Sequence, residues 1–122
     1  MKKKILLVDD DQFFRDAFID ELTHEKYKVF SAGKGAEAIK KIATNDFDVV
    51  ITDIGMPKVN GIEVLKFTKK NKPKTKVIMM SGYVTRKVIE ELMKLGADEY
   101  IEKFSFLKDI PGVLDRIILK RK

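Results

Sequence analysis

The chain has 122 residues, of which 44% are hydrophobic and 36% charged, and its formal net charge is +6. This size suits one domain with a buried core, and no apolar run approaches the roughly 20 residues of a membrane-spanning helix. The absence of cysteine excludes a disulfide scaffold and a thiolate metal site. We therefore expect a single domain over residues 1–122 that resides in the cytoplasm and makes no membrane contact.

The positive charge raises the question of nucleic-acid binding. Lysines gather between Lys66 and Lys76 and again at Lys120–Lys122. No helix-turn-helix, zinc-finger or aromatic stacking motif accompanies them, so a solvated, lysine-rich surface is the preferred interpretation. Steeply salt-dependent DNA binding by the chain alone would reverse that preference.

Apolar strand-like runs alternate with helical patterns five times, which predicts a parallel sheet wound with helices. In chain order we expect a strand at Lys4–Val8, a helix at Gln12–His24, a strand at Lys28–Ala32, a helix at Gly35–Thr44, a strand at Val49–Asp53, a turn-rich loop at Ile54–Gly61, a helix at Ile62–Asn71, a strand at Lys76–Met80, a helix at Thr85–Leu95, a strand at Glu99–Glu102 and a helix at Asp109–Lys120. Thr85 and Gly96 are expected to cap the fourth helix. The last helix is placed after a loop because Pro111 fits only in a helix's first turn.

Polar side chains stand where four of the expected strands end. Asp9 and Asp10 follow the first strand, Asp53 closes the third, Ser81 follows the fourth and Lys103 follows the fifth. Because the carboxyl ends of adjacent parallel strands meet at one edge of a sheet, we expect these side chains to share one rim. Three close carboxylates require a cation, and hard oxygen ligands suit Mg²⁺. With a hydroxyl and an ammonium beside them, the set is suited to phosphoryl transfer, with one carboxylate as the acceptor.

Each of these residues also has a simpler interpretation. Asp10 or Asp11 could cap the first helix, Asp53 and Ser81-Gly82 could form turns, and Lys103 could be one of many solvated lysines. The joint occurrence of all of them at strand ends, in this order, favours the functional interpretation.

Four motifs make the chain resemble the receiver domain of bacterial two-component response regulators over essentially its whole length. They are Ile5–Asp10, Asp53–Pro57 with Asn60-Gly61, Ile78–Gly82 and Gly96–Lys103. The resemblance implies a doubly wound, flavodoxin-like (βα)5 fold. Its five parallel strands would follow the order 2-1-3-4-5, which is already known for chemotaxis members of this family.

The resemblance also implies a phosphoacceptor and its metal site. Asp53 is similar to the aspartate that attacks a phosphohistidine or a small phosphodonor. Asp10 is similar to a direct Mg²⁺ ligand and Asp9 to an outer or water-bridged one, and the backbone carbonyl of Gly55 completes the protein's share. Mn²⁺ is the expected substitute for Mg²⁺.

Three further positions resemble the family's switch. Lys103 matches the lysine that pairs with the phosphoryl oxygens, Ser81 the hydroxyl that is drawn toward the phosphoryl group, and Tyr100 the aromatic that turns inward with it. Ordinary packing of an edge-strand aromatic is the alternative for Tyr100. The implied partners are a histidine kinase or histidine phosphotransfer domain and an output partner that the sequence does not name, with homodimerisation on phosphorylation left open.

The chain departs from the family pattern at three positions. The family usually has Lys-Pro with a cis bond, whereas this chain reads Lys103-Phe104. A cis bond before a non-proline residue costs about 2.5–4 kcal/mol, so the loop is either trans and rearranged or strained. Gly55 has no side chain to orient a hydrolytic water, and Tyr83 is bulky beside the switch. From these two residues we expect slow loss of the phosphoryl group.

Two phenylalanine positions bear on partner contacts. Helical spacing places Phe14 in the core and Phe13 at its edge. The family docks its phosphodonor domain near this helix, so Phe13 is either exposed for that contact or a second core residue. Phe67 falls on an outward-facing position of the third helix.

The preferred interpretation is a phosphorylation-switched signalling module that catalyses its own phosphorylation and turns over no substrate. A phosphohydrolase of the haloacid dehalogenase type also uses an aspartate nucleophile and Mg²⁺. Such enzymes usually carry a second acid two residues after the nucleophile, where this chain has Gly55, and they need a cap or extra length. A third alternative is a constitutive pseudo-receiver that is never phosphorylated, which only Lys103-Phe104 favours.

Overall fold

The structure, a computed structural model, describes residues 2–22 and 26–118. One parallel sheet holds five strands in the order β2-β1-β3-β4-β5. The strands are β1 (Lys3–Val8), β2 (Tyr27–Ala32), β3 (Val49–Asp53), β4 (Lys76–Ser81) and β5 (Glu99–Glu102). The helices are α1 (Gln12–Glu21), α2 (Gly35–Thr44), α3 (Gly61–Asn71), α4 (Arg86–Lys94), α5 (Lys103–Lys108) and α6 (Ile110–Ile118). The expected doubly wound fold and its strand order are confirmed.

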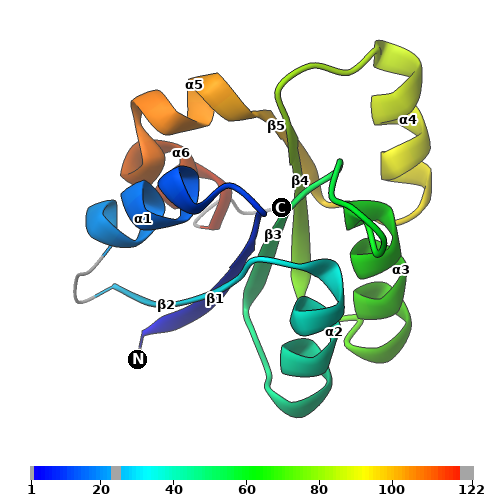
Figure 1. The fold of residues 1–122 in the computed structure, drawn as a ribbon, viewed down its shortest axis with the longest axis horizontal. Coiled ribbons are helices and arrows are strands. Elements are labelled where there is room, and N and C mark those ends of the chain that lie inside the picture. The colour runs from blue at the N-terminus through cyan, green and yellow to red at the C-terminus, as the bar shows by residue number, and fades with distance from the viewer. Residues whose placement is uncertain (1, 23–25, 119–122) are drawn as a thin grey trace.

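Helices cover both faces of the sheet. Figure 1 shows α1, α5 and α6 on one side and α2, α3 and α4 on the other. Successive residues of a strand point to opposite faces. Ile5 and Leu7 accordingly pack with the α1 and α6 side chains, and Leu6 and Val8 pack with those of α2 and α3. The apolar runs that predicted the strands are therefore buried on both faces.

The first face is organised by three phenylalanine rings. The centroid of Phe106 lies 6.3 Å from that of Phe14 and 5.9 Å from that of Phe18, the second pair meeting edge to face. Phe106 and Phe18 are completely buried. These contacts fix α5 against α1 next to the carboxyl ends of β1 and β5.

One element was predicted wrongly. The segment after β5 was expected to be a loop up to Asp109, but it forms the helix α5, and α6 follows as a separate helix. The Glu102 side chain caps α5, and Phe106 anchors it in the core, so tertiary contacts stabilise a segment that helical periodicity did not reveal. Pro111 lies in the first turn of α6, as expected.

Other boundaries agree with the sequence to within a few residues. Thr85 caps α4, and Gly96 adopts a φ of 107° just after it. Helix α1 ends at Glu21, and the ends expected at His24 and Lys120 lie outside the described residues.

Phe67 differs from the expectation. It was placed on an outward-facing position, but it is half-buried and packs on the cluster between the sheet and α2 and α3. Over residues 2–22 and 26–118, no helix has the length and hydropathy that crossing a bilayer requires.

Candidate functional site

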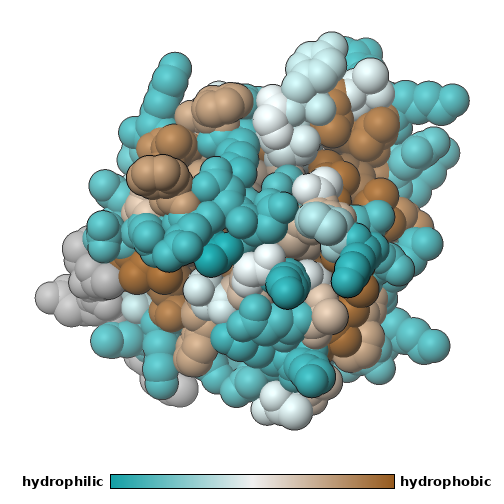
Figure 2. All heavy atoms as spheres, in the orientation of Figure 1, coloured by the Kyte–Doolittle hydropathy of each residue, from teal (hydrophilic) through white to brown (hydrophobic). Residues whose placement is uncertain are grey.

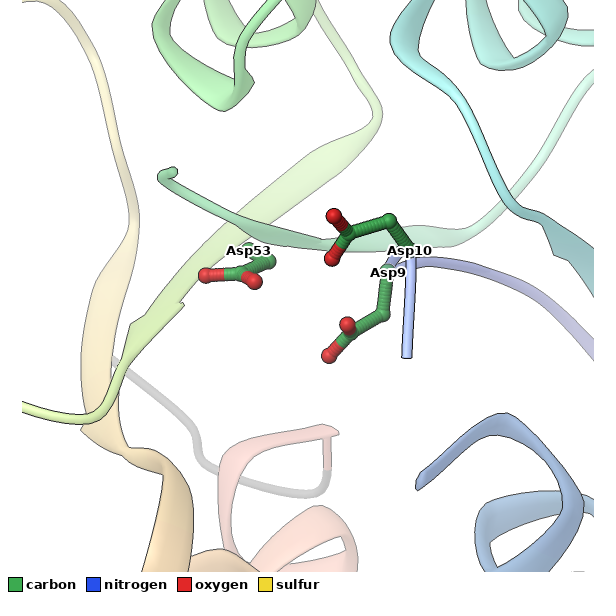
Figure 3. Close-up of side chains that lie close together, drawn as sticks. All are labelled: Asp9, Asp10 and Asp53. Carbon is green, nitrogen blue, oxygen red and sulfur yellow. The ribbon is translucent and has the colours of Figure 1, made fainter. Parts of the chain in front are cut away.

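Asp9, Asp10 and Asp53 gather at the carboxyl ends of β1 and β3. These strands are neighbours, and Val8 pairs with Thr52. The residues that follow this pair, Asp9 and Asp53, therefore lie side by side. Each carboxylate offers one oxygen, and these three oxygens lie within 4.8 Å of one another. Figure 3 shows the three side chains close together at the strand ends. Asp9 is completely buried, Asp53 is half-buried and Asp10 is exposed.

Lys103 reaches this cluster from the start of α5. Its Nζ lies 2.9 Å from Asp9 Oδ2 and 3.8 Å from Asp11 Oδ2. The ammonium also lies 4.9 Å from the centroid of the Phe14 ring, within the range of a cation–π contact. Burial alone would lower the pKa of Lys103, but the carboxylates of Asp9, Asp53 and Asp11 raise it above its ordinary value. The lysine is therefore a fixed positive charge at the rim.

The surroundings of Asp53 oppose its charge, whereas those of Lys103 favour the charged form. Burial first, and then the charge of Asp9, raise the pKa of Asp53 to about 6, although Lys103 and a hydrogen bond from the Gly55 N–H act against this. That N–H lies 3.4 Å from Asp53 Oδ1. A carboxylate whose ionisation is opposed in this way gains most from a cation placed beside it.

The loop after Asp53 is held by α3. Gly61 begins that helix, and a Cβ at this position would lie 2.1 Å from the Asp53 carbonyl oxygen. The Gly61 N–H donates to the Ile54 carbonyl at 3.0 Å. Asn60 and Glu63 form a capping box at the same end. Glycine is needed here because the helix start and the strand end approach closely, and this contact fixes the backbone of Asp53.

The remaining predicted residues surround the same rim. Asp53 pairs with Met80 in the sheet, so Ser81, the last residue of β4, lies one position beyond it. The Tyr100 hydroxyl donates to the Ser81 carbonyl at 3.3 Å. Burial first, and then the charge of Glu102, raise the pKa of Tyr100. Tyr100 is half-buried and packs on the cluster between the sheet and α4.

The acidic cluster fits a small divalent cation. Its three carboxylates supply hard oxygen donors. The Oδ2 atom of Asp9 is buried, and apart from the Lys103 ion pair it has no partner in the part of the chain that is described. Asp9, Asp10 and Asp53 are therefore the residues that could hold Mg²⁺ or Mn²⁺.

The Lys103-Phe104 step resolves one alternative left open by the sequence. No peptide bond among the described residues is cis, so this step is trans. The Phe104 N–H donates to Glu102 Oε2 at 3.1 Å. The rearranged trans loop is thus the form that this chain adopts, and it begins α5 directly at Lys103.

Sequence reasoning missed two neighbours of Lys103. Glu102 gave no signal because glutamate is not among the preferred cap residues. The contact with the Phe14 ring depends on how α1 and α5 pack. Asp11, considered as a cap, does cap α1, with its Oδ1 accepting the Phe13 N–H at 2.9 Å.

An apolar groove of about 250 Å³ opens beside this rim. Side chains of α1, of its cap and of α5 line it, namely Asp11, Phe13, Phe14, Ala17, Lys103, Phe104 and Leu107. Phe13 is 88% exposed, which resolves its two expected placements in favour of the surface. Figure 2 shows hydrophobic side chains over α5 and α1, in the upper left of the view.

A family model and the related proteins found by sequence comparison point to the same family. The family model described as the response regulator receiver domain matches residues 5–114. The chemotaxis protein CheY of Thermotoga maritima is 36% identical over 104 residues, which are 84% of this chain and 87% of that protein. The alkaline phosphatase synthesis transcriptional regulatory protein PhoP of Bacillus subtilis is 35% identical over 105 residues, which are 84% of this chain and 43% of PhoP. The chain therefore spans less than half the length of PhoP.

Solved structures agree with the fold. The receiver domain of the Francisella response regulator 1452 superposes with a TM-score of 0.86 at 27% identity, over 99% of this chain and 100% of that chain. The response regulator domain of Thermotoga maritima CheB gives a TM-score of 0.84 at 27% identity and covers both chains completely, 100% of each.

Proposed function

The chain belongs to the response regulator receiver family, and from that premise we propose that Asp53 accepts a phosphoryl group from a phosphohistidine or a small acyl phosphate. The observation that carries the proposal is that Asp53, a half-buried carboxylate, lies at the same rim as the ammonium of Lys103, which the buried Asp9 holds in an ion pair. Asp53 has a pKa raised to about 6, so at neutral pH it is mostly ionised and able to attack. Lys103 is held against Asp9 at 2.9 Å beside it.

The proposed transfer is a single displacement at phosphorus. An Asp53 carboxylate oxygen forms the new P–O bond while the P–N bond of phosphohistidine, or the P–O bond of the acyl phosphate, breaks. The leaving imidazole or carboxylate takes the electron pair of that bond. Lys103 neutralises the phosphoryl oxygens, and the Ser81 hydroxyl donates a hydrogen bond to them. A cation held by Asp9, Asp10, Asp53 and the Gly55 carbonyl would supply further positive charge at the same oxygens.

Phosphorylation would then change the face formed by α4, β5 and α5. Ser81 and Tyr100 are already connected, because the Tyr100 hydroxyl bonds the Ser81 carbonyl. If the end of β4 shifted as Ser81 was drawn toward a phosphoryl group, this carbonyl would move and release Tyr100 to repack. The output partner, or a second copy of the chain, would bind the changed face.

The expected phosphodonor partner is a histidine kinase or a histidine phosphotransfer domain. The groove between α1 and α5 opens at Lys103 and is rimmed by the exposed rings of Phe13 and Phe104. A donor domain seated there would place its phosphohistidine near the acidic rim. Phe13→Ser should therefore slow transfer from a phosphohistidine protein while leaving transfer from a small acyl phosphate unchanged. Equal slowing of both reactions would remove the groove from the proposal.

This chemistry changes the chain itself and turns over no external substrate. A phosphohydrolase would need a group that rapidly releases the phosphoryl from Asp53, and the position two residues later is Gly55. A constitutive pseudo-receiver would not need the pairing of Lys103 with the acidic cluster. The phosphoacceptor function therefore accounts for more of the site than either alternative.

Incubation with Mg²⁺ and a small acyl phosphate tests the proposal. Intact-mass measurement should find one added phosphoryl group on the wild type and none on Asp53→Asn. Asp16→Asn, at an exposed position of α1, is the matched control and should be modified like the wild type. An unmodified wild type that also fails to bind Mg²⁺ would show that the acceptor assignment is incorrect.

A further inference from the structure

The carboxylate of Glu102 is the cap of the helix that begins with Lys103. Its Oε2 accepts the Phe104 N–H at 3.1 Å, and its Oε1 accepts the Ser105 N–H at 3.0 Å and the Ser105 hydroxyl at 2.8 Å. These hydrogen bonds, that of the Ser105 hydroxyl first, lower the pKa of Glu102. The half-buried Glu102 thus makes three hydrogen bonds to the two residues Phe104 and Ser105.

The position of this cap matters because its hydrogen bonds span Lys103. Lys103 is the residue between the cap, Glu102, and the first capped N–H, that of Phe104. Helix α5 has only 6 residues, too few to be stable without external contacts. Phe106, completely buried, anchors its middle. The Glu102 cap is what fixes its beginning, where the lysine side chain leaves the backbone.

The sequence departure at position 104 adds one of the three hydrogen bonds of the cap. A proline there would have no N–H to donate. Phe104 has one, and the Glu102 carboxylate takes it. The trans Lys103-Phe104 step and the glutamate before it therefore form one local arrangement, which holds the lysine by hydrogen bonds.

We propose that Glu102 is a positioning residue, whose carboxylate holds the backbone of Lys103 so that the ammonium stays at Asp9 and Asp53. The proposal rests on the phosphoacceptor function of Asp53. A shift of the Lys103 backbone would displace the ammonium from the phosphoryl oxygens, and a small misplacement of a charge at a reacting group is enough to slow a reaction. Glu102 itself would contact neither the phosphoryl group nor a metal.

The alternative is that the cap contributes only to the stability of the fold. The chain offers a matched control in Asp109, whose Oδ1 accepts the Gly112 N–H at 3.0 Å at the start of α6. Both side chains are carboxylates that cap a C-terminal helix, but Asp109 does not adjoin Lys103. A general loss of stability should be similar for Glu102→Ala and Asp109→Ala.

The experiment measures the rate of Asp53 phosphorylation by a small acyl phosphate at saturating Mg²⁺, using the full chain. Glu102→Ala should be slower than the wild type by about tenfold. Glu102→Gln, which keeps one acceptor oxygen, should recover part of the loss, and Asp109→Ala should match the wild type. Thermal melting of each variant, measured in parallel, shows whether it is folded.

A double-mutant cycle separates positioning from a structural role. If Glu102 acts through Lys103, adding Glu102→Ala to Lys103→Ala should not slow phosphorylation further, although it should still lower the melting temperature. Additive rate losses would overturn the proposal, as would a wild-type rate in folded Glu102→Ala. A wild type that is not phosphorylated at all would instead contradict the function of Asp53.

Discussion

Gly55 leaves open space two residues after the proposed phosphoacceptor. A Cβ built at this position meets no heavy atom within 4 Å. A polar side chain there would fit without moving the backbone and could orient a water toward the phosphoryl group. We predict that Gly55→Asn speeds loss of the phosphoryl group on the order of tenfold, below the usual range for a general base.

Intact mass followed over time after removal of the phosphodonor gives this rate. Tyr83 is the second residue expected to slow the loss, but its side chain is 84% exposed. An exposed ring shields the site poorly, so Tyr83→Ala should change the rate less than Gly55→Asn. A fast wild-type rate that Gly55→Asn does not raise would contradict the role assigned to Gly55.

At the residue scale, strand-end geometry made the acidic cluster predictable. Asp9, Asp10 and Asp53 follow apolar runs whose pairing in a parallel sheet leaves few alternatives for where they meet. The capping role of Glu102 was not predictable in the same way, because it depends on a local turn that glutamate rarely makes. The contact of Lys103 with the Phe14 ring requires knowing how two helices pack.

Among the elements, the start of α3 packs directly against the backbone of the proposed phosphoacceptor. A Cβ on Gly61 would lie 2.1 Å from the Asp53 carbonyl oxygen and 2.9 Å from Ile54 Cα, and backbone atoms cannot rotate away. We predict that Gly61→Ala destabilises the fold by about 1–3 kcal/mol, the usual cost of overpacking. It should also slow phosphorylation, because relief of the clash moves Asp53.

Urea denaturation and the phosphorylation rate measure the two effects. Gly55→Ala is the matched control, since it adds the same methyl group to the same loop where space is open. It should change both quantities less than Gly61→Ala does. Equal stability of the two variants would mean that α3 does not constrain the acceptor strand.

At the element scale, apolar periodicity predicted the strands and the longer helices, but it did not predict α5. Its 6 residues complete too few turns for a periodic pattern. Its stability comes from Phe106 in the core and from the Glu102 cap, neither of which is a local propensity. Sequence periodicity is therefore least able to predict short helices that depend on tertiary contacts.

For the whole molecule, the acidic rim makes stability depend on pH and on divalent cations. The pKa of Asp53 is raised from 3.8 to about 6 in the folded chain. The folded state thus binds a proton that the unfolded state has already lost, between about pH 4 and 6. The stabilisation from this proton is complete below the unfolded pKa and is lost as the pH rises through 6.

We predict that Asp53→Asn is more stable than the wild type at pH 8 in metal-free buffer, and that this difference shrinks at pH 5. A shift of two pKa units corresponds to roughly 3 kcal/mol. Partial solvent exposure of the rim should reduce the difference to about 1–2 kcal/mol. Urea denaturation of both proteins across this pH range measures it, and comparing the two cancels the titration of groups that they share.

Mg²⁺ should make the wild type more stable than Asp53→Asn. A cation bound by the three carboxylates stabilises the folded state by about 2.7 kcal/mol at 100 times its dissociation constant. Asp53→Asn and Asp10→Asn each lack one charged donor, so both should gain less than the wild type at the same Mg²⁺ concentration. Sodium chloride at matched ionic strength controls for general screening. If Mg²⁺ stabilised all three proteins equally, the cation would be bound elsewhere on the molecule, and the carboxylate rim would not be its site.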